Sequence, residues 1–113
     1  MTVVVLSKPV LGTVPPELTE FGSEMLDKFL HTMEREELRP QAICLYTEGV
    51  RLACQGSPVL LGLELLNGLG VKVLLCGSCV EKLGLAESVK VGEISTMKDI
   101  VECLSSADRV LYP

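Results

Sequence analysis

Gly70-Val71-Lys72-Val73-Leu74-Leu75-Cys76-Gly77-Ser78-Cys79 is the stretch that decides the fold. Residues 71–75 form a mostly apolar run of strand length, which is typical of a strand buried on both faces. Cys76-Gly77-Ser78-Cys79 then offers a turn into a short helix that ends near Gly84. In open α/β sheets, reacting groups gather just beyond the carboxyl ends of the strands. The stretch therefore predicts a sheet with two cysteines at its reactive edge.

The segments on both sides alternate between short apolar runs and helical stripes. The runs predict four more strands, over residues 2–6, 42–46, 89–91 and 109–111. Helical spacing predicts helices over about 18–33, over 58–68 after the start signal Ser57-Pro58, and over about 96–104. This order predicts an α/β fold: a mostly parallel sheet of about five strands with helices on both faces.

Two of these helices differ in where their apolar residues fall. In the first, Leu18, Phe21 and Leu26 belong to one stripe, so we expect a single face to pack on the sheet. The helix over 58–68 is apolar on nearly every side, which is costly for a surface helix of a monomer. We expect its second face to meet another copy of the chain, which predicts a homo-oligomer.

Composition limits the classes of function. A length of 113 residues predicts one domain over 1–113. The net charge is −5 and the basic residues are scattered, which disfavours nucleic-acid and membrane-surface binding. No segment reads as a signal peptide or a membrane span, so we expect a cytoplasmic protein. Five cysteines, an odd number, then favour reduced thiols over a disulfide framework.

No motif for a cofactor or metal is evident. Gly68-Leu69-Gly70 precedes a strand instead of following one, so we interpret it as a helix stop and expect no nucleotide cofactor. A metal site needs about four ligands, but the chain has one CxxC pair and one histidine, His31, on the polar side of its helix. We therefore expect no metal.

The two cysteines of the CxxC are the first candidates for catalysis. Cys79 falls in the first turn of the predicted helix, where free N–H groups and the helix dipole can lower a thiol pKa from about 8.5 toward 7. Cys76 is placed to attack a disulfide or persulfide on Cys79, or to exchange roles with it. The alternative is that both thiols simply pack under a loop, because free cysteine is often buried.

The other three cysteines carry weaker signals. Cys54 follows a strand-like piece and precedes a helix start, so we expect it at the same edge of the sheet as the pair. Cys44, within a predicted strand, and Cys103, on the flank of the last helix, are interpreted as packing residues. Glu48, Arg51, Lys8 and Lys82 are the charged residues that could stand near the cysteines.

Three motifs in order resemble a known family. They are Tyr46-Thr47-Glu48-Gly49-Val50-Arg51-Leu52-Ala53-Cys54-Gln55-Gly56-Ser57, the stretch 70–79, and Val91-Gly92-Glu93-Ile94-Ser95-Thr96-Met97. Together they resemble the C-terminal domain of YedF-type proteins in the DsrE/DsrF-like family. The resemblance implies a flavodoxin-like fold, oligomers and participation in sulfur relay. By motif position it implies that Cys76 carries persulfide sulfur, with Cys79 as the second thiol of the pair.

The chain lacks the TusA-like domain that precedes this one in full-length YedF-type proteins. Either the domain stands alone or it is part of a longer protein. If it stands alone, its sulfur donor and acceptor are other proteins. The resemblance also connects YedF-type proteins with selenium metabolism, which no residue here establishes. The sequence leaves three hypotheses: a persulfide carrier with sulfurtransferase-like activity, a thiol–disulfide redox protein using Cys76 and Cys79, and a non-catalytic subunit of an oligomer. Cys76, Cys79 and Cys54 are the candidate site residues of the first.

Overall fold

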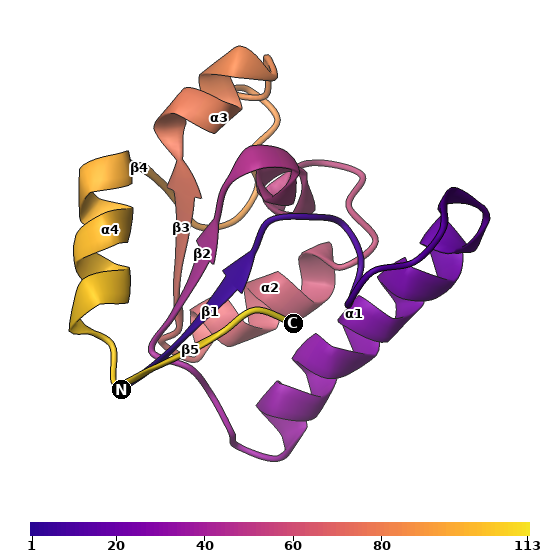
Figure 1. Cartoon of the computed structure of the whole chain (residues 1–113), viewed down its shortest axis with the longest axis horizontal. Coiled ribbons are helices and arrows are strands. Elements are labelled where there is room, and N and C mark those ends of the chain that lie inside the picture. Colours follow the sequence, from indigo (N-terminus) through magenta and orange to yellow (C-terminus); the bar gives the residue numbers. More distant parts are fainter.

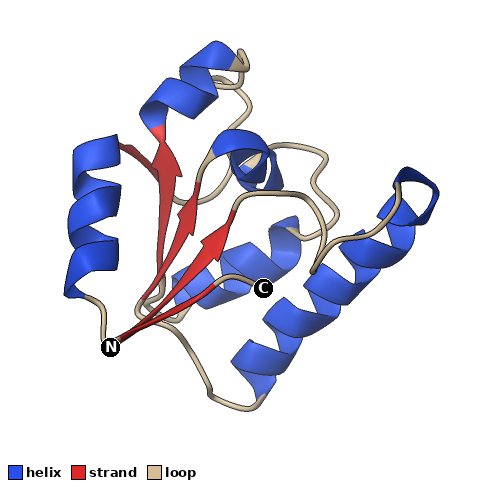
Figure 2. Cartoon of the chain, in the orientation of Figure 1, coloured by secondary structure: helices blue, strands red, loops and turns tan.

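The computed structural model describes all residues, 1–113, and has a five-stranded, all-parallel sheet at its centre (Figures 1 and 2). The strands lie in the order β4-β3-β2-β1-β5. Their bounds are β1 (Thr2–Leu6), β2 (Ala42–Leu45), β3 (Lys72–Cys76), β4 (Glu93–Ser95) and β5 (Arg109–Leu111). The α-helices are α1 (Thr19–Arg35), α2 (Leu60–Gly68), α3 (Gly77–Lys82) and α4 (Met97–Ser106), and the 3-10 helices are η1 (Pro16–Leu18) and η2 (Thr47–Ala53). The predicted α/β fold is confirmed.

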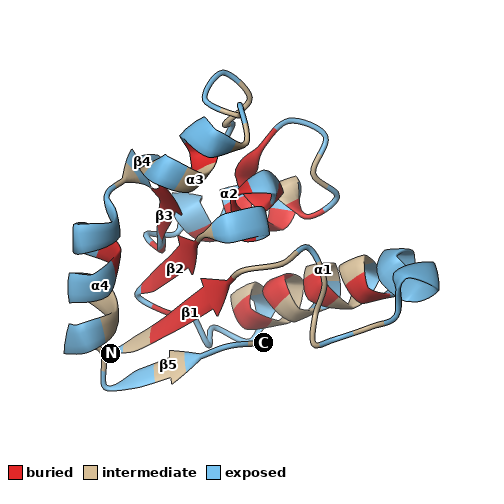
Figure 3. Ribbon diagram, turned by 45° about the horizontal axis from the view of Figure 1, so that its top comes forward, coloured by how far each residue is buried: buried red, intermediate tan, exposed pale blue.

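Each central strand sends alternate side chains to two separate clusters, because successive residues of a strand point to opposite faces. Val4 and Leu6 of β1 join the larger cluster, which contains the buried side of α1 and α2. Val3 joins the smaller cluster, which Ile100 of α4 covers. Figure 3 shows β1 to β3 buried along most of their length, with exposure on the outer sides of the helices. Helices therefore cover both faces, as predicted.

The order of connections explains which helices share a face. The chain advances from β1 to β2 to β3 through α1 and then α2, on one face of the sheet. It then crosses from β4 at one edge to β5 at the other through α4, on the opposite face (Figure 1). All carboxyl ends meet at one edge, where η2 follows β2 and α3 follows β3. None of the helices combines the length and the apolar character needed to cross a bilayer.

The strand predicted over 89–91 is wrong, and the edge strand is β4. Val89 forms an isolated antiparallel bridge with Cys54, and Val91 is buried in the larger cluster. Gly92, at a φ of 84°, then turns the chain toward β4, and a Cβ there would lie 2.6 Å from the Val73 carbonyl oxygen. Apolar residues mark buried strands, whereas β4 is an exposed edge with a polar sequence, so it gave no such signal.

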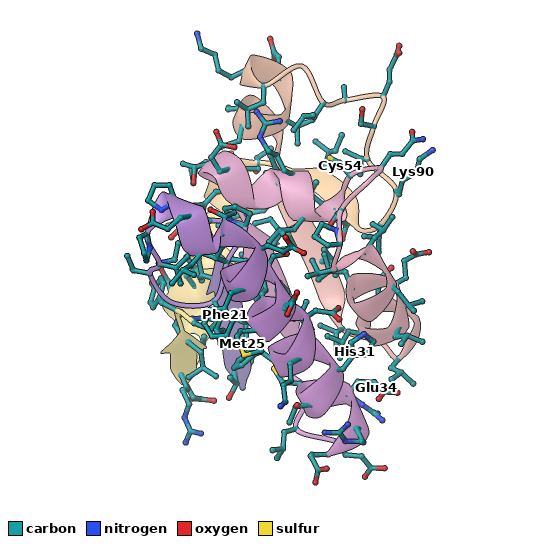
Figure 4. All side chains as sticks on the ribbon, turned by 90° about the vertical axis from the view of Figure 1, so that its right-hand side faces the viewer. Phe21, Met25, His31, Glu34, Cys54 and Lys90 are labelled. Carbon is teal, nitrogen blue, oxygen red and sulfur yellow. The ribbon has the colours of Figure 1, made fainter.

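The helix boundaries and faces also differ in detail. The helix predicted over 58–68 begins at Leu60, because Ser57 Oγ accepts the Val59 N–H at 3.2 Å within a preceding turn. In α1 the buried residues are Gly22, Leu26, Leu30 and Met33. Leu18 and Phe21 are 46% and 52% exposed, so their placement in the packing stripe was wrong. Figure 4 labels Phe21 and Met25 on this helix.

Candidate thiol site

The turn between β3 and α3 places the two CxxC cysteines differently. Cys76 is the last residue of β3, has extended backbone dihedrals and is fully buried. Gly77 opens α3 beside β4, where a Cβ would lie 2.9 Å from the Ser95 carbonyl oxygen. Glycine therefore lets the helix begin directly at the end of the strand. Cys79 follows in the first turn of α3 and is partly exposed, touching both apolar clusters.

Cys79 lies in a surface hollow of about 490 Å³. The hollow is lined by Thr47, Glu48, Ser78, Cys79, Lys82 and Leu83. Glu48 and Lys82, two of the four charged residues that could stand near the cysteines, thus line the same hollow as Cys79. Arg51 and Lys8 do not line the hollow. Arg51 binds the Glu48 carboxylate, and the Lys8 ammonium donates to Thr13 Oγ1. The hollow gives a partner molecule access to the Cys79 sulfur while Cys76 stays covered.

Thr47 is the residue of this site that the sequence analysis missed. Its backbone N–H donates to Cys79 Sγ at 3.1 Å, which links η2 to α3. Its φ is 49°, a left-handed conformation that is uncommon for a β-branched residue. Two positions further on, a Cβ on Gly49 would lie 1.9 Å from the Leu6 carbonyl oxygen, so the chain can turn this tightly only with glycine there. That glycine, shortly after the apolar strand that ends at Leu45, was the available sequence signal.

The pKa of the Cys79 thiol is raised, whereas the sequence analysis expected it to be lowered. Burial is the largest cause, because removing water disfavours the charged thiolate. The Thr47 amide acts in the opposite direction by donating to the sulfur, and the neighbouring Cys76 thiol raises the pKa further. The expectation failed because it considered only the helix N-terminus and neither the burial nor the second thiol.

Cys54 lies at the end of η2, away from the hollow. It is buried, and its thiol donates to the Val50 carbonyl oxygen at 3.3 Å. Its backbone pairs with the loop that holds Val89, and Figure 4 shows Cys54 close to Lys90 of that loop. Burial raises the pKa of Cys54, and the nearby Arg51 charge lowers it by less. The structure therefore does not bring Cys54 into the hollow beside Cys79.

Cys44 and Cys103 form a second pair of neighbouring thiols. Cys44 is fully buried in the middle of β2, and Cys103 of α4 packs against the same small cluster. Burial, followed by the charge and thiol of Cys103, raises the pKa of Cys44 to about 12. Cys44 therefore stays protonated at neutral pH, in keeping with a packing role.

The charged and ligating side chains do not converge elsewhere. His31 of α1 lies 3.4 Å from an Asp27 carboxylate oxygen of the same helix. No group of three or more histidine, cysteine, aspartate or glutamate side chains is arranged to hold a metal ion. Figure 4 labels His31 and Glu34 on α1, whereas the labelled Cys54 follows η2. The pair Cys76 and Cys79 is thus the one group of candidate residues that the fold brings to the carboxyl edge of the sheet.

A family model for the DsrE/DsrF-like family matches residues 26–113, which include β2, β3, α3 and the whole thiol site. The chain belongs to the DsrE/DsrF-like family. The match confirms the resemblance that the three motifs indicated. A search of curated proteins found no match.

Solved structures with the same fold come from bacteria and an archaeon. The YchN protein of E. coli is 23% identical, with all of both chains covered and a TM-score of 0.67. Protein MTH1491 of Methanobacterium thermoautotrophicum, of unknown function, is 15% identical and has a TM-score of 0.71; the match covers 99% of this chain and 97% of the MTH1491 chain. Protein BT1422 of Bacteroides thetaiotaomicron, also of unknown function, is 18% identical, covers 99% and 94%, and has a TM-score of 0.67. At these identities the likeness supports the fold alone.

Proposed function

We propose that this protein is a sulfur-relay carrier that holds sulfane sulfur as a persulfide on Cys79. The observation that carries the proposal is the contrast in access: Cys79 lines an open hollow, whereas Cys76, three residues earlier, is fully buried. Family membership supports the class of function, because the DsrE/DsrF-like resemblance connects these proteins with sulfur relay. Between the two thiols left open by the sequence, access favours Cys79 as the carrier.

Loading is a transfer from a donor persulfide. The Cys79 thiolate attacks the outer sulfur of the donor, a new bond forms to Cys79 Sγ, and the donor's own S–S bond breaks. The donor leaves as a thiolate. The step thus consumes the donor persulfide and the Cys79 thiolate, and produces the Cys79 persulfide and the donor thiolate. Unloading repeats the step with an acceptor thiolate attacking the outer sulfur on Cys79. Donor and acceptor are other proteins, and no cofactor takes part.

Cys76 is placed to release the cargo when no acceptor is present. Its thiolate can attack Cys79 Sγ, forming a Cys76–Cys79 disulfide and expelling hydrosulfide. The closeness of the two thiols, which raises the pKa of Cys79, supports this role. The same closeness favours the second candidate function, a thiol–disulfide redox protein. That alternative predicts a reversible Cys76–Cys79 disulfide in graded glutathione, without any sulfur adduct.

A separate observation favours the third candidate function, a non-catalytic subunit of an oligomer. Leu61 and Leu65 on α2, and Leu69 directly after it, are 63%, 40% and 46% exposed, although the helix lies against the core. We propose that this face contacts a second copy of the chain. Light scattering after size exclusion tests it: a stable monomer at micromolar concentration would remove the homo-oligomer from the proposal, while leaving the thiol chemistry in place.

The test of the carrier is mass spectrometry after incubation with a persulfide donor. We expect wild type to gain about 32 Da, one sulfur atom, on the peptide that contains Cys79. Cys79→Ser should lose the adduct, Cys76→Ser should retain it for longer, and Cys54→Ser should behave as wild type. Cys103→Ser is the matched control, because Cys103 is also partly exposed. An unmodified Cys79 beside a modified Cys103 would contradict the proposal.

A further inference from the structure

We propose that Thr47 is the positioning residue of the thiol site, and that its backbone N–H stabilises negative charge on Cys79 Sγ in both half-reactions of sulfur transfer. The inference deepens the proposed carrier function and rests on it. It concerns a residue on η2, not on the helix that carries the cysteine. The distance from the Thr47 nitrogen to Cys79 Sγ is 3.1 Å, which is within hydrogen-bonding distance of sulfur.

The first step of the argument is that Thr47 adopts an uncommon backbone conformation. Two residues other than glycine have positive φ, Glu37 at 58° and Thr47 at 49°. Glu37 is exposed in the turn after α1, whereas Thr47 is β-branched and its amide faces a cysteine. Left-handed backbone is disfavoured for L-residues, and most strongly for β-branched ones. A strained residue that persists at a candidate site is held there by surrounding contacts.

The second step is that identifiable contacts hold Thr47 in place. Its hydroxyl lies 3.0 Å from the Ser7 carbonyl oxygen and 2.7 Å from the Tyr46 carbonyl oxygen, and donates its hydrogen to this pair of acceptors. The Gly49 N–H donates to the Tyr46 carbonyl oxygen at 3.0 Å, which closes the turn. Gly49 also lies directly against the Leu6 carbonyl oxygen. The turn after β2 is therefore anchored to the end of β1, and the anchor directs the Thr47 amide at Sγ.

The third step is that Cys79 depends on this donor. Thr47 N–H makes the one hydrogen bond that Sγ receives. The Cys76 thiol interacts with the sulfur, and two charged residues line the same hollow: Glu48, whose carboxylate is bound by Arg51, and Lys82. Burial and Cys76 disfavour the thiolate, and the amide opposes them. Glu48 and Lys82 carry opposite charges, so the fixed amide supplies the directed stabilisation.

The same amide serves loading and unloading. In loading, Sγ is the attacking thiolate, and a donated hydrogen bond raises the fraction of thiolate at a given pH. In unloading, the acceptor thiolate bonds to the outer sulfur, the bond from that sulfur to Sγ breaks, and its electron pair returns to Sγ. Sγ is then the leaving thiolate, and the leaving group departs faster when its charge is stabilised. One backbone group therefore assists sulfur transfer in both directions.

The test is an amide-to-ester replacement at Thr47, made with the α-hydroxy acid that keeps the threonine side chain. It deletes the N–H and keeps the Thr47 hydroxyl and its Ser7 acceptor, while the Tyr46 carbonyl becomes an ester carbonyl. The readout is the pH profile of Cys79 alkylation by iodoacetamide, followed on its peptide with Cys103 as the internal standard. We expect the apparent pKa of Cys79 to rise by about one unit, a tenfold loss of reactivity below that pKa. The same ester at Thr13, whose N–H donates no hydrogen bond, is the control and should leave the profile unchanged.

Side-chain variants give an independent measurement if the ester does not fold. Thr47→Ala removes the hydroxyl anchor and should shift the Cys79 profile upward, whereas Thr47→Ser should restore it. A general structural defect would change Cys103 alkylation as well. An unchanged Cys79 profile in the ester, or equal profiles for Thr47→Ala and Thr47→Ser, would overturn the inference.

The inference and the carrier function fail in different ways. A Cys79 pKa that follows Thr47, with no sulfur adduct on Cys79, would contradict the carrier function and leave the amide's effect established. A sulfur adduct on Cys79, together with a Cys79 pKa that does not depend on Thr47, would support the carrier function and contradict the role of the Thr47 amide.

Discussion

The two pairs of neighbouring cysteines lie on one sheet but in different environments. Each pair joins a fully buried thiol to a partly exposed one: Cys76 with Cys79 at the carboxyl edge, and Cys44 of β2 with Cys103 of α4. The exposed member of the first pair receives a backbone N–H and lines a hollow beside two charged residues. Cys103 has no such backbone donor: its sulfur interacts with the thiol of Cys44, whose pKa is raised to about 12. Both pairs therefore have two thiols close together. The candidate site differs in having the Thr47 N–H as a hydrogen-bond donor to sulfur and in lying at the carboxyl end of β3.

The largest expected contrast is in reactivity of the buried member Cys44. With a pKa of about 12, about one molecule in ten thousand carries the Cys44 thiolate at pH 8. We expect its alkylation in the folded protein to be at least about a thousandfold slower than in denaturant, where its pKa returns to an ordinary value. Peptide mass spectrometry after iodoacetamide treatment measures both rates. Rapid labelling of native Cys44 would erase the distinction between the pairs.

The second expectation concerns stability at alkaline pH. The folded state binds the Cys44 proton more tightly than the unfolded state, so this stabilisation is complete below pH 9 and is lost as the pH rises toward 12. The rise of the Cys44 pKa from 9.0 to about 12 corresponds to a loss of about 4 kcal/mol in unfolding free energy once the pH has reached about 12. Urea unfolding from pH 8 to 11 measures the loss. Cys44→Ala should flatten the slope, and an equally steep slope in that variant would contradict the assignment.

The third expectation tests whether the carboxyl edge depends on its tight turn. Gly49→Ala places a Cβ 1.9 Å from a backbone oxygen of β1, so the turn has to move. We expect a loss of about 2 kcal/mol or more in unfolding free energy, together with an altered pH profile for Cys79. Gly68→Ala, which meets open space at the end of α2, is the matched control. Equal stability of the two variants would show that the turn tolerates a side chain.

The smallest expected effect is on sulfur loading when the second pair of cysteines is changed. Cys103→Ser removes the partly exposed thiol of the second pair, and we expect sulfur loading on Cys79 to stay within about twofold of wild type. The measurement is the initial rate of adduct formation on the Cys79 peptide. A large loss of loading in Cys103→Ser would mean that the two pairs act together.

The sequence predicted the three central strands and the edge strand β5, which has the predicted bounds 109–111, but missed the other edge strand. Residues 2–6, 42–46 and 71–75 are apolar because both their faces are covered, and the strands appear within one residue of those ranges. The polar strand β4 was missed because an edge strand has fewer residues to bury. The turn carrying Cys76 and Cys79 was also predicted, since strand end and helix start are local signals.

The electrostatics of the site depended on contacts that a sequence does not display. The raised pKa of Cys79 follows from burial and from Cys76, which require the packed structure. Thr47 was missed because its positive φ arises from contacts with β1, some forty residues earlier in the chain. The pairing of Cys44 with Cys103 likewise depends on which face α4 covers.

The pairing of β5 with β1 has a consequence for how the protein is made. Thr2 lies opposite Arg109, and the Met1 ammonium binds the Asp108 carboxylate, 107 positions along the chain. Synthesis from the amino end therefore produces β1, β2, β3 and both CxxC cysteines well before β5 exists. Throughout that interval one edge of β1, an apolar strand, has no partner and can pair with a strand of another nascent chain. The time between synthesis of β1 and synthesis of β5 is therefore the time for which this edge lacks its native partner.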